Sequence, residues 1–299
     1  MKGIIFVILA CLMWALDTLI RYPLLFSGKS AELIVFAEHL LLCLLFVPVL
    51  WKSFKKFSQA KVSHVLYFFI IGGLGSAIGT LAFTKAFFIV NPSLVILLQK
   101  LQPIVAIVLA YIVLKERMKP AFFGWAVLAL IGGVMISYQD LAPAIKLIMD
   151  GKLDLSSQAF TGYGLALVAV VSWGAATVFG KLLGKKGYDE KEIMGGRFLM
   201  GLICLLPFLL SFNISVPLDG SFWAKIVILA GMSGALGMYL YYRGLKEIPA
   251  HLCTLAEMFF PFLAVIVNWV FLGKDLSMLQ ISGAALLLMS STVIQLRHY

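Results

Sequence analysis

The sequence predicts an all-α membrane protein whose ten transmembrane helices form two inverted five-helix repeats around a central cavity. Three observations support this fold class: the composition, the series of long apolar segments and an internal repeat. Of the 299 residues, 62% are hydrophobic and 13% are charged, whereas soluble domains average about 45–50% apolar and about 25% charged residues. The apolar segments are continuous rather than alternating, which excludes a transmembrane β-barrel.

Ten apolar segments are long enough to cross a bilayer. A hydrocarbon core about 30 Å thick needs about 20 apolar residues per helix, so ten spans leave room only for short connections. The predicted spans are residues 3–22, 33–51, 64–88, 93–114, 121–139, 162–183, 192–212, 222–244, 251–272 and 277–296. The longest connection, residues 140–161, is predicted to be an external loop between a first repeat, residues 1–139, and a second repeat, residues 162–299.

The two halves resemble each other at a nearly constant spacing. Trp14 and Trp173 are 159 residues apart, and Pro103 and Pro261 are 158 residues apart. The number of matches at nearly one spacing, which include tryptophans and prolines, indicates an internal repeat. Chance similarity between two apolar sequences does not explain so many. The other pairs at these spacings are Gly3 and Gly162, Ala10 and Ala169, Thr18 and Thr177, Pro48 and Pro207, Gly73 and Gly231, Gly79 and Gly237, Lys85 and Arg243, and Ala106 and Ala264.

The charges of the connections predict how the halves are oriented. Because five is odd, the second half enters the membrane from the opposite side. Basic connections stay in the cytoplasm, and here they are residues 52–61, 115–119 and 181–191. We therefore expect a multi-pass protein of a bacterial-type inner membrane with both termini cytoplasmic. The basic residues, which give a formal net charge of +10, lie dispersed between spans, so their expected partner is membrane lipid and not nucleic acid.

An inverted repeat indicates a transport mechanism. Two similar halves of opposite orientation can exchange conformations, so that a central site opens to each side in turn. We therefore expect a secondary transporter of a small metabolite, working by alternating access as a monomer or weak dimer. The alternatives are a channel, or an intramembrane lipid or glycosyl-group transferase. A transferase would need clustered carboxylates, and the spans contain only isolated Asp17, Glu38 and Glu257.

No catalytic residue, cofactor or metal site is expected. The cysteines lie inside predicted spans, without CxxC spacing and without clustered histidines, which is typical of buried apolar cysteines. They are Cys11, Cys43, Cys204 and Cys253. Nothing in the sequence indicates ATP hydrolysis, so a gradient must drive the transport.

The arrangement resembles the EamA-type branch of the drug/metabolite transporter superfamily, over the whole chain. The paired tryptophans, glycine runs and prolines support the resemblance, and Leu-Lys-Glu-Arg at 114–117 is similar to the Leu-Gly-Glu-Arg that often closes the fourth span in this family. The resemblance implies ten helices, inverted repeats, a central cavity, alternating access and cytoplasmic termini. Two departures are Glu38, where the family often has a basic residue, and Gly273-Lys274-Asp275, which replaces an acidic closing motif. Membership does not fix the substrate.

One polar and aromatic face in each half is predicted to line the cavity. Trp14, Asp17 and Thr18 share a helix face with Arg21, because residues three, four and seven positions apart lie on one side of a helix. Such a face does not suit contact with lipid, because ionisable groups inside the membrane are costly. The other half repeats it. The remaining cavity candidates are Gln99, Trp173, Thr177 and Tyr239. The span of Tyr239 also contains Tyr241 and Tyr242, and for all three tyrosines packing is an equal alternative.

Ionisable residues inside spans are costly and usually face a protein interior. We predict gates at both ends of the cavity: outer Glu38 with Lys100 or Lys85, and inner Glu257 with Arg197 or Arg243. For Lys85 and Arg243, snorkelling to the interface is an equal alternative. These four cations exceed the three carboxylates, counting Asp17, by one charge. The excess favours a carboxylate-bearing solute such as an amino acid.

Overall fold

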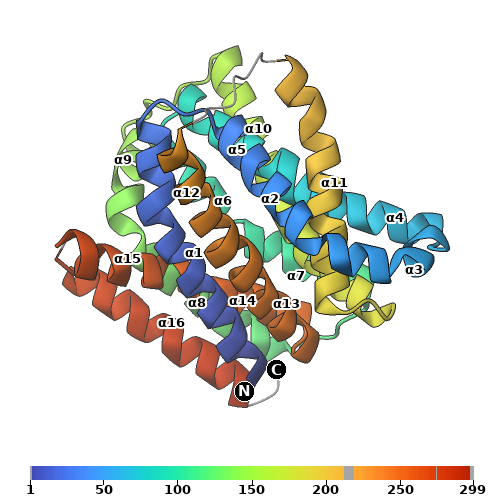
Figure 1. Cartoon of the computed structure of the whole chain (residues 1–299). Coiled ribbons are helices and arrows are strands. Elements are labelled where there is room, and N and C mark those ends of the chain that lie inside the picture. Colours follow the sequence, from blue (N-terminus) through green and yellow to red (C-terminus); the bar gives the residue numbers. More distant parts are fainter. Residues whose placement is uncertain (1, 212–218, 274, 297–299) are drawn as a thin grey trace.

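The computed structural model describes residues 2–211, 219–273 and 275–296, and the described residues form a bundle of helices without strands (Figure 1). By length and composition, seven spans among them can cross a membrane, and α8 with α9, bent by 94°, makes an eighth candidate. The helices are α1 (Lys2–Phe26), α2 (Ala31–Lys52), α3 (Phe54–Ser58), α4 (Val62–Phe68), the π-helix η1 (Phe69–Ile78), α5 (Gly79–Ile89), α6 (Pro92–Gln99), α7 (Gln102–Leu114), α8 (Pro120–Ile136), α9 (Tyr138–Met149), α10 (Ser157–Lys185), α11 (Glu190–Ser211), α12 (Gly220–Leu229), the π-helix η2 (Ala230–Gly237), α13 (Met238–Glu247), α14 (Ala250–Glu257), α15 (Phe259–Leu272) and α16 (Met278–Leu296).

Each predicted span coincides with one helix or with a series of helices that follow one another along the chain. The end of the predicted seventh span, Phe212, lies outside the described residues, as do Lys274 and the last residues of the predicted second repeat, 297–299.

The predicted external loop, residues 140–161, is largely helical. α9 covers most of its first half, and α10 begins at Ser157. Leu141 and Ala144 are buried whereas the polar side chains of α9 face outward, which is the pattern of an amphipathic helix packed on a bundle. α9 packs along α6. α9 was not predicted, because its twelve residues are too few to span a membrane and only spanning helices were sought.

Two spans are interrupted near their middles at prolines. Between α6 and α7 the break falls at Lys100 and Leu101, and between α14 and α15 it falls at Met258. A proline has no N–H for the carbonyl four residues earlier, so Pro103 and Pro261 leave the carbonyls of Gln99 and Glu257 without their helical bonds. Gln99 and Glu257 are the last residues of α6 and α14.

Three features of the first half recur 158 or 159 residues later. The π-helix η1 has its counterpart in η2, and the break after α6 has its counterpart after α14. α7 ends at Lys115 (φ 56°) and α15 at Gly273 (φ 64°), both in the left-handed region. Such a conformation costs a non-glycine residue roughly 1–2 kcal/mol, yet Lys115 adopts it at the position that corresponds to Gly273.

The halves pack by exchanging partners. α1 lies against α13, η2 and α15, while α10 lies against α5, η1 and α7; α2 packs on α11, and α8 on α16. The two tryptophans follow the same pattern. Trp14 lies over Gly237 and 5.5 Å from the Tyr241 ring, and Trp173 lies over Gly79 and 4.9 Å from the Phe83 ring.

Contacts between connections define two ends of the bundle. At the Gly3 end, Gly3 packs on Ile248, and the turn after α7 meets the start of α14. The segment after α2 meets the turn after α10, and the start of α11 meets α13. α1 begins and α16 ends in this region (Figure 1), where Ile4 and Ile294 line one small cavity. At the Gly162 end, Gly162 packs on Val90, and the turn after α1 meets α5.

Candidate functional site

A polar cluster around one carboxylate lies where the two interrupted spans meet. Glu257, the last residue of α14, accepts hydrogen bonds from Gln102 Nε2 (3.0 Å), Tyr241 Oη (2.9 Å) and Thr177 Oγ1 (3.2 Å). The Thr177 and Tyr241 hydroxyl oxygens lie 2.7 Å apart, and since each hydroxyl has one hydrogen, a bond between them takes the place of one of their bonds to Glu257. We call these four residues the Glu257 cluster. They come from four different spans, two of which are broken at this point, so the cluster lies at a junction of both halves.

The Glu257 cluster has an aromatic side. Trp14 of α1 lies 5.5 Å from the Tyr241 ring, with 48° between the ring planes. Trp14, Gln102 and Glu257 are half-buried although they lie on spans packed inside the bundle, whereas Thr177 and Tyr241 are buried. Aromatic surface, an amide, hydroxyls and a carboxylate are therefore within reach of a small polar ligand.

A second cluster centres on Arg21 of α1. Its guanidinium binds Asp17 through Nε (2.6 Å) and Nη2 (2.8 Å), and Glu38 through Nη1 and Nη2 (2.8 Å each). Ser233 of η2 donates to Asp17 at 2.5 Å. Asp17 and Glu38 are 6% and 7% exposed. The two carboxylates accept from four of the five N–H donors of the guanidinium, and the cluster ties α1 to α2 and to η2.

A cavity of about 370 Å³ opens at the Gly162 end. It lies between the turn after α1, the start of α2 and the end of α5. Its polar lining includes Lys29, Glu32, Thr84 and Lys85, and the Lys85 ammonium lies 3.8 Å from the Glu32 carboxylate.

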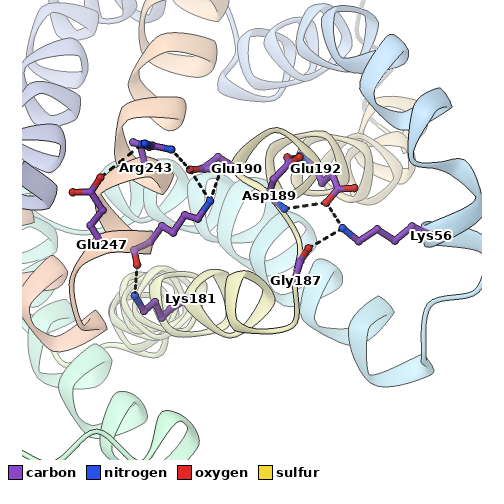
Figure 2. A network of polar contacts seen from close by, with 9 residues as sticks. Lys56, Lys181, Gly187, Asp189, Glu190, Glu192, Arg243 and Glu247 are labelled. Carbon is purple, nitrogen blue, oxygen red and sulfur yellow. Dashed lines mark hydrogen bonds and ion pairs between the residues drawn. The ribbon is translucent and has the colours of Figure 1, made fainter.

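The Gly3 end is closed by an ion-pair network on the turn between α10 and α11 (Figure 2). Glu190 accepts from Arg243 (3.1 Å) and Lys246 (3.3 Å) of α13, and Glu192 binds Lys56 from the segment after α2. Both carboxylates are less than a tenth exposed. We call these five residues the Gly3-end network. It links the α10–α11 turn to α3 on one side and to α13 on the other.

A capping box holds the network in place. Asp189 Oδ1 accepts from the Glu192 N–H (2.8 Å), and Glu192 Oε2 accepts from the Asp189 N–H (2.9 Å), so each side chain satisfies a free donor at the start of α11. Nearby, the Lys181 ammonium donates to the carbonyls of Leu245 (2.7 Å) and Ile248 (2.9 Å), which satisfies acceptors at the end of α13.

Glu116 caps a helix of the other half. Its carboxylate accepts from the backbone N–H groups of Ala250 (2.9 Å) and His251 (3.2 Å) and lies 2.6 Å from His251 Nδ1. Burial raises the pKa of the Glu116 carboxyl, but the hydrogen bonds from His251 and Ala250 lower it further, so the pKa lies below its ordinary value.

The structure pairs the predicted gate residues differently from the prediction. Glu38 binds Arg21 instead of Lys85 or Lys100, and Glu257 binds neutral donors instead of Arg197 or Arg243. The remaining predicted gate residues have these partners: Lys85 has Glu32, Arg243 has Glu190 and Glu247, and Arg197 donates to Tyr242 Oη at 3.0 Å. Lys100 lies at the break after α6 and has no ion pair with any described residue.

The predicted cavity residues are only partly brought together. Trp14 and Thr177 lie at the Glu257 cluster, while Asp17 belongs to the Arg21 cluster. Tyr239 is 37% exposed and outside both clusters, and Tyr241 occupies the interior instead. The others lie elsewhere: Gln99 ends α6, Thr18 donates to the Ala15 carbonyl (2.6 Å), and Trp173 packs on Phe83.

Sequence reasoning missed Gln102, Ser233, Glu190 and Glu192. For Gln102 the available signal was its place beside Pro103, where a span breaks. For Glu192 it was Asp189, three residues earlier, which is the spacing of a capping box. Ser233 offered no local signal, since its partner Asp17 is 216 residues away.

Comparisons with known proteins agree with this architecture. The model of the EamA-like transporter family matches residues 1–138 and 160–296. A riboflavin transporter, ImpX, from Fusobacterium nucleatum subsp. nucleatum is 34% identical over 296 residues, covering 97% of this chain and 96% of that protein. An uncharacterized transporter, YoaV, from Bacillus subtilis is 28% identical over 270 residues, covering 89% and 84%. One crystal structure superposes with a TM-score of 0.73 at 18% identity over 98% of this chain and 97% of the other, which shows a shared fold.

Proposed function

The chain belongs to the EamA-like transporter family, and we propose that it transports a flat heteroaromatic metabolite such as riboflavin across a bacterial-type inner membrane. As a member of that family it is a secondary transporter of a small metabolite and not an enzyme. We propose in addition that the chain has ten spans in two inverted halves and that it works by alternating access. We further propose that it works as a monomer or weak dimer surrounded by lipid.

The recurring features support ten spans in two halves. π-helices, breaks and left-handed helix ends fall at matching positions, and α1 and α10 have matching partners in the opposite half. The two ends of the bundle support inversion, because the first half begins at the Gly3 end and the second at the Gly162 end. The basic segment after α2 and the basic turn after α10 both lie at the Gly3 end, so this end faces the cytoplasm in our proposal.

The Glu257 cluster with Trp14 is the observation on which the solute rests. A riboflavin-like ring system is flat and aromatic, and its edge offers carbonyl acceptors and an imide N–H donor. Trp14 supplies an aromatic surface, Gln102 an amide and Glu257 an acceptor, all half-buried. The 34% identical relative is named a riboflavin transporter. The carboxylate-bearing solute predicted from the excess of deep cations has less support, because two of the four cations counted, Lys85 and Arg243, have carboxylate partners.

The structure supports a closed cytoplasmic side in this conformation. The Gly3-end network joins segments of both halves across that end, while the cavity of about 370 Å³ lies at the opposite end. We therefore assign the inner gate to Glu190 and Glu192, in place of pairs between Glu257 and Arg197 or Arg243.

Counterflow tests the solute. Proteoliposomes loaded with unlabelled riboflavin should take up labelled riboflavin transiently against its gradient, which a channel cannot produce. Trp14→Ala should raise the half-saturation concentration roughly tenfold, because the lost aromatic contact is worth about 1 kcal/mol or more. Trp51→Ala is the matched control, since Trp51 is 81% exposed on the outer surface. Absence of counterflow, or equal effects of the two variants, would remove riboflavin-like solutes from the proposal.

A further inference from the structure

We propose that Glu257 is the proton-binding site through which a proton gradient drives transport. This inference rests on the proposed transport function and adds the coupling ion. The proton binds from the side of higher proton concentration and is released to the other side, so no bond other than O–H forms or breaks.

Glu257 differs from the other carboxylates inside the spans. Asp17 and Glu38 both bind the Arg21 guanidinium at 2.6–2.8 Å. Glu257 accepts only from an amide and two hydroxyls, and no lysine, arginine or histidine of the described residues forms an ion pair with it. An ionised carboxylate inside a membrane protein is costly without a compensating cation. A proton supplies that compensation.

Among the described residues, the cations nearest to Glu257 form hydrogen bonds with other groups and make no ion pair with its carboxylate. Arg197 of α11 donates to Tyr242 (3.0 Å), and Lys181 of α10 donates to carbonyls at the end of α13. The Cys11 thiol of α1 lies 3.7 Å from the backbone carbonyl of Glu257, not from its carboxylate. The titratable and charged groups that interact with Glu257 are Cys11 of α1, Arg197 of α11, Tyr241 of α13 and Cys253 of α14, and none of them places a positive charge in contact with its carboxylate.

Proton binding would change what the cluster offers to a solute. The ionised carboxylate can only accept hydrogen bonds, whereas the protonated acid also donates one at one oxygen. Protonation therefore redistributes the hydrogen bonds among Gln102, Tyr241 and Thr177. Because Trp14 and Gln102 are also the proposed solute contacts, proton and solute share hydrogen-bonding groups, and this sharing couples their binding free energies.

The test compares two rates in proteoliposomes with riboflavin as the probe. One is uptake driven by an imposed pH gradient, and the other is counterflow at equal pH. Their ratio cancels changes in turnover or in the amount of folded protein. Wild type should show gradient-driven accumulation. In Glu257→Gln this ratio should fall to the value that is measured when no pH gradient is imposed. Glu257→Asp should keep part of the response to the gradient. The control, Asp150→Asn, alters an exposed carboxylate near Lys152 and should keep the wild-type ratio.

The outcomes separate this inference from the proposed solute. If wild type shows counterflow but no response to the pH gradient, or if Glu257→Gln keeps the response, the proton site is wrong and the transporter assignment stands. If riboflavin gives no counterflow, infrared difference spectra of the purified protein still decide. A protonated-carboxyl band that grows on acidification must be present in wild type and missing in Glu257→Gln, and equal bands in both proteins would overturn the proposal.

Discussion

At the scale of single residues, the start of α14 shows how one half completes the other. α14 is preceded by Pro249, whose side chain cannot accept a hydrogen bond, whereas α6 is preceded by Asn91, which accepts from the Ser93 N–H at 2.9 Å. Asn91 and Pro249 are 158 residues apart and correspond in the repeat. Glu116 of the first half supplies the missing cap of α14. This gives a physical reason for an acidic residue in the Leu-Lys-Glu-Arg segment.

Glu116→Ala should lower the free energy of unfolding by about 1–3 kcal/mol, because the two backbone donors and His251 lose their acceptor. The control is Glu247→Ala, which alters an exposed carboxylate 3.7 Å from Arg243 and should cost at most about 0.5 kcal/mol. Thermal unfolding in detergent measures both.

The same carboxylate has a defined pH signature. The pKa of Glu116 lies below its ordinary value in the folded protein, because hydrogen bonds from His251 and Ala250 outweigh the effect of burial. Its contribution is therefore complete above the unfolded pKa of about 4.3 and is lost as pH falls through the folded value. The stability difference between wild type and Glu116→Ala should shrink only in acid. A difference that is constant down to that range would contradict the cap.

At the scale of elements, the positions of the spans followed from the sequence and their pairings did not. Long apolar segments predicted the helices, because that signal is local, and Pro103 and Pro261 account for the breaks in two of them. The partner of Glu38 could not be predicted. Arg21 was grouped with Asp17 on a helix face, but only the packing of α1 on α2 shows that it also reaches Glu38. Likewise Tyr239 and Tyr241 are two residues apart, and the helix rotation that buries Tyr241 depends on α1 and α10.

The π-helix η1 packs unusually closely on α11. A Cβ added to Gly72 would lie 2.2 Å from the Arg197 carbonyl oxygen, which is backbone and cannot rotate away. Gly72→Ala should therefore force the helices apart and cost roughly 1–3 kcal/mol. Gly124→Ala on α8 is the matched control, since nothing lies within 4 Å of its added Cβ, and alanine is the better helix former by about 1 kcal/mol. Gly72→Ala should lower the unfolding temperature and Gly124→Ala should not. Equal stability of the two variants would show that η1 and α11 do not pack as described.

At the scale of the whole molecule, the two ends of the bundle differ in how their segments are joined. At the Gly162 end, apolar contacts of Leu24, Leu33 and Phe222 join α1, α2 and α12 beside an open cavity. At the Gly3 end, the ion-pair network joins the segments. Glu190 and Glu192 are each less than a tenth exposed. A structure that leaves such a buried carboxylate without its cation is strongly destabilised. The network therefore favours the conformation closed at the Gly3 end, and the transporter must break these pairs to open there.

The double variant Glu190→Gln, Glu192→Gln should open the Gly3 end. Glutamine keeps the capping box of α11, since it serves as well as glutamate at that position, so the variant removes charge while keeping the start of the helix. A loss of about 1.4 kcal/mol from the closed state shifts the ratio of conformations tenfold.

A single cysteine at the half-buried Gln99, in a cysteine-free background, reports access to the break after α6. An impermeant thiol reagent should label it roughly tenfold faster from the Gly3 side than in the parent protein, and no faster from the Gly162 side. Asp150→Asn should change neither rate. Inside-out vesicles and intact cells present the two sides separately, so the experiment also shows which end faces the cytoplasm. Faster labelling from the Gly162 side, or none from either, would refute the assignment of the inner gate to Glu190 and Glu192.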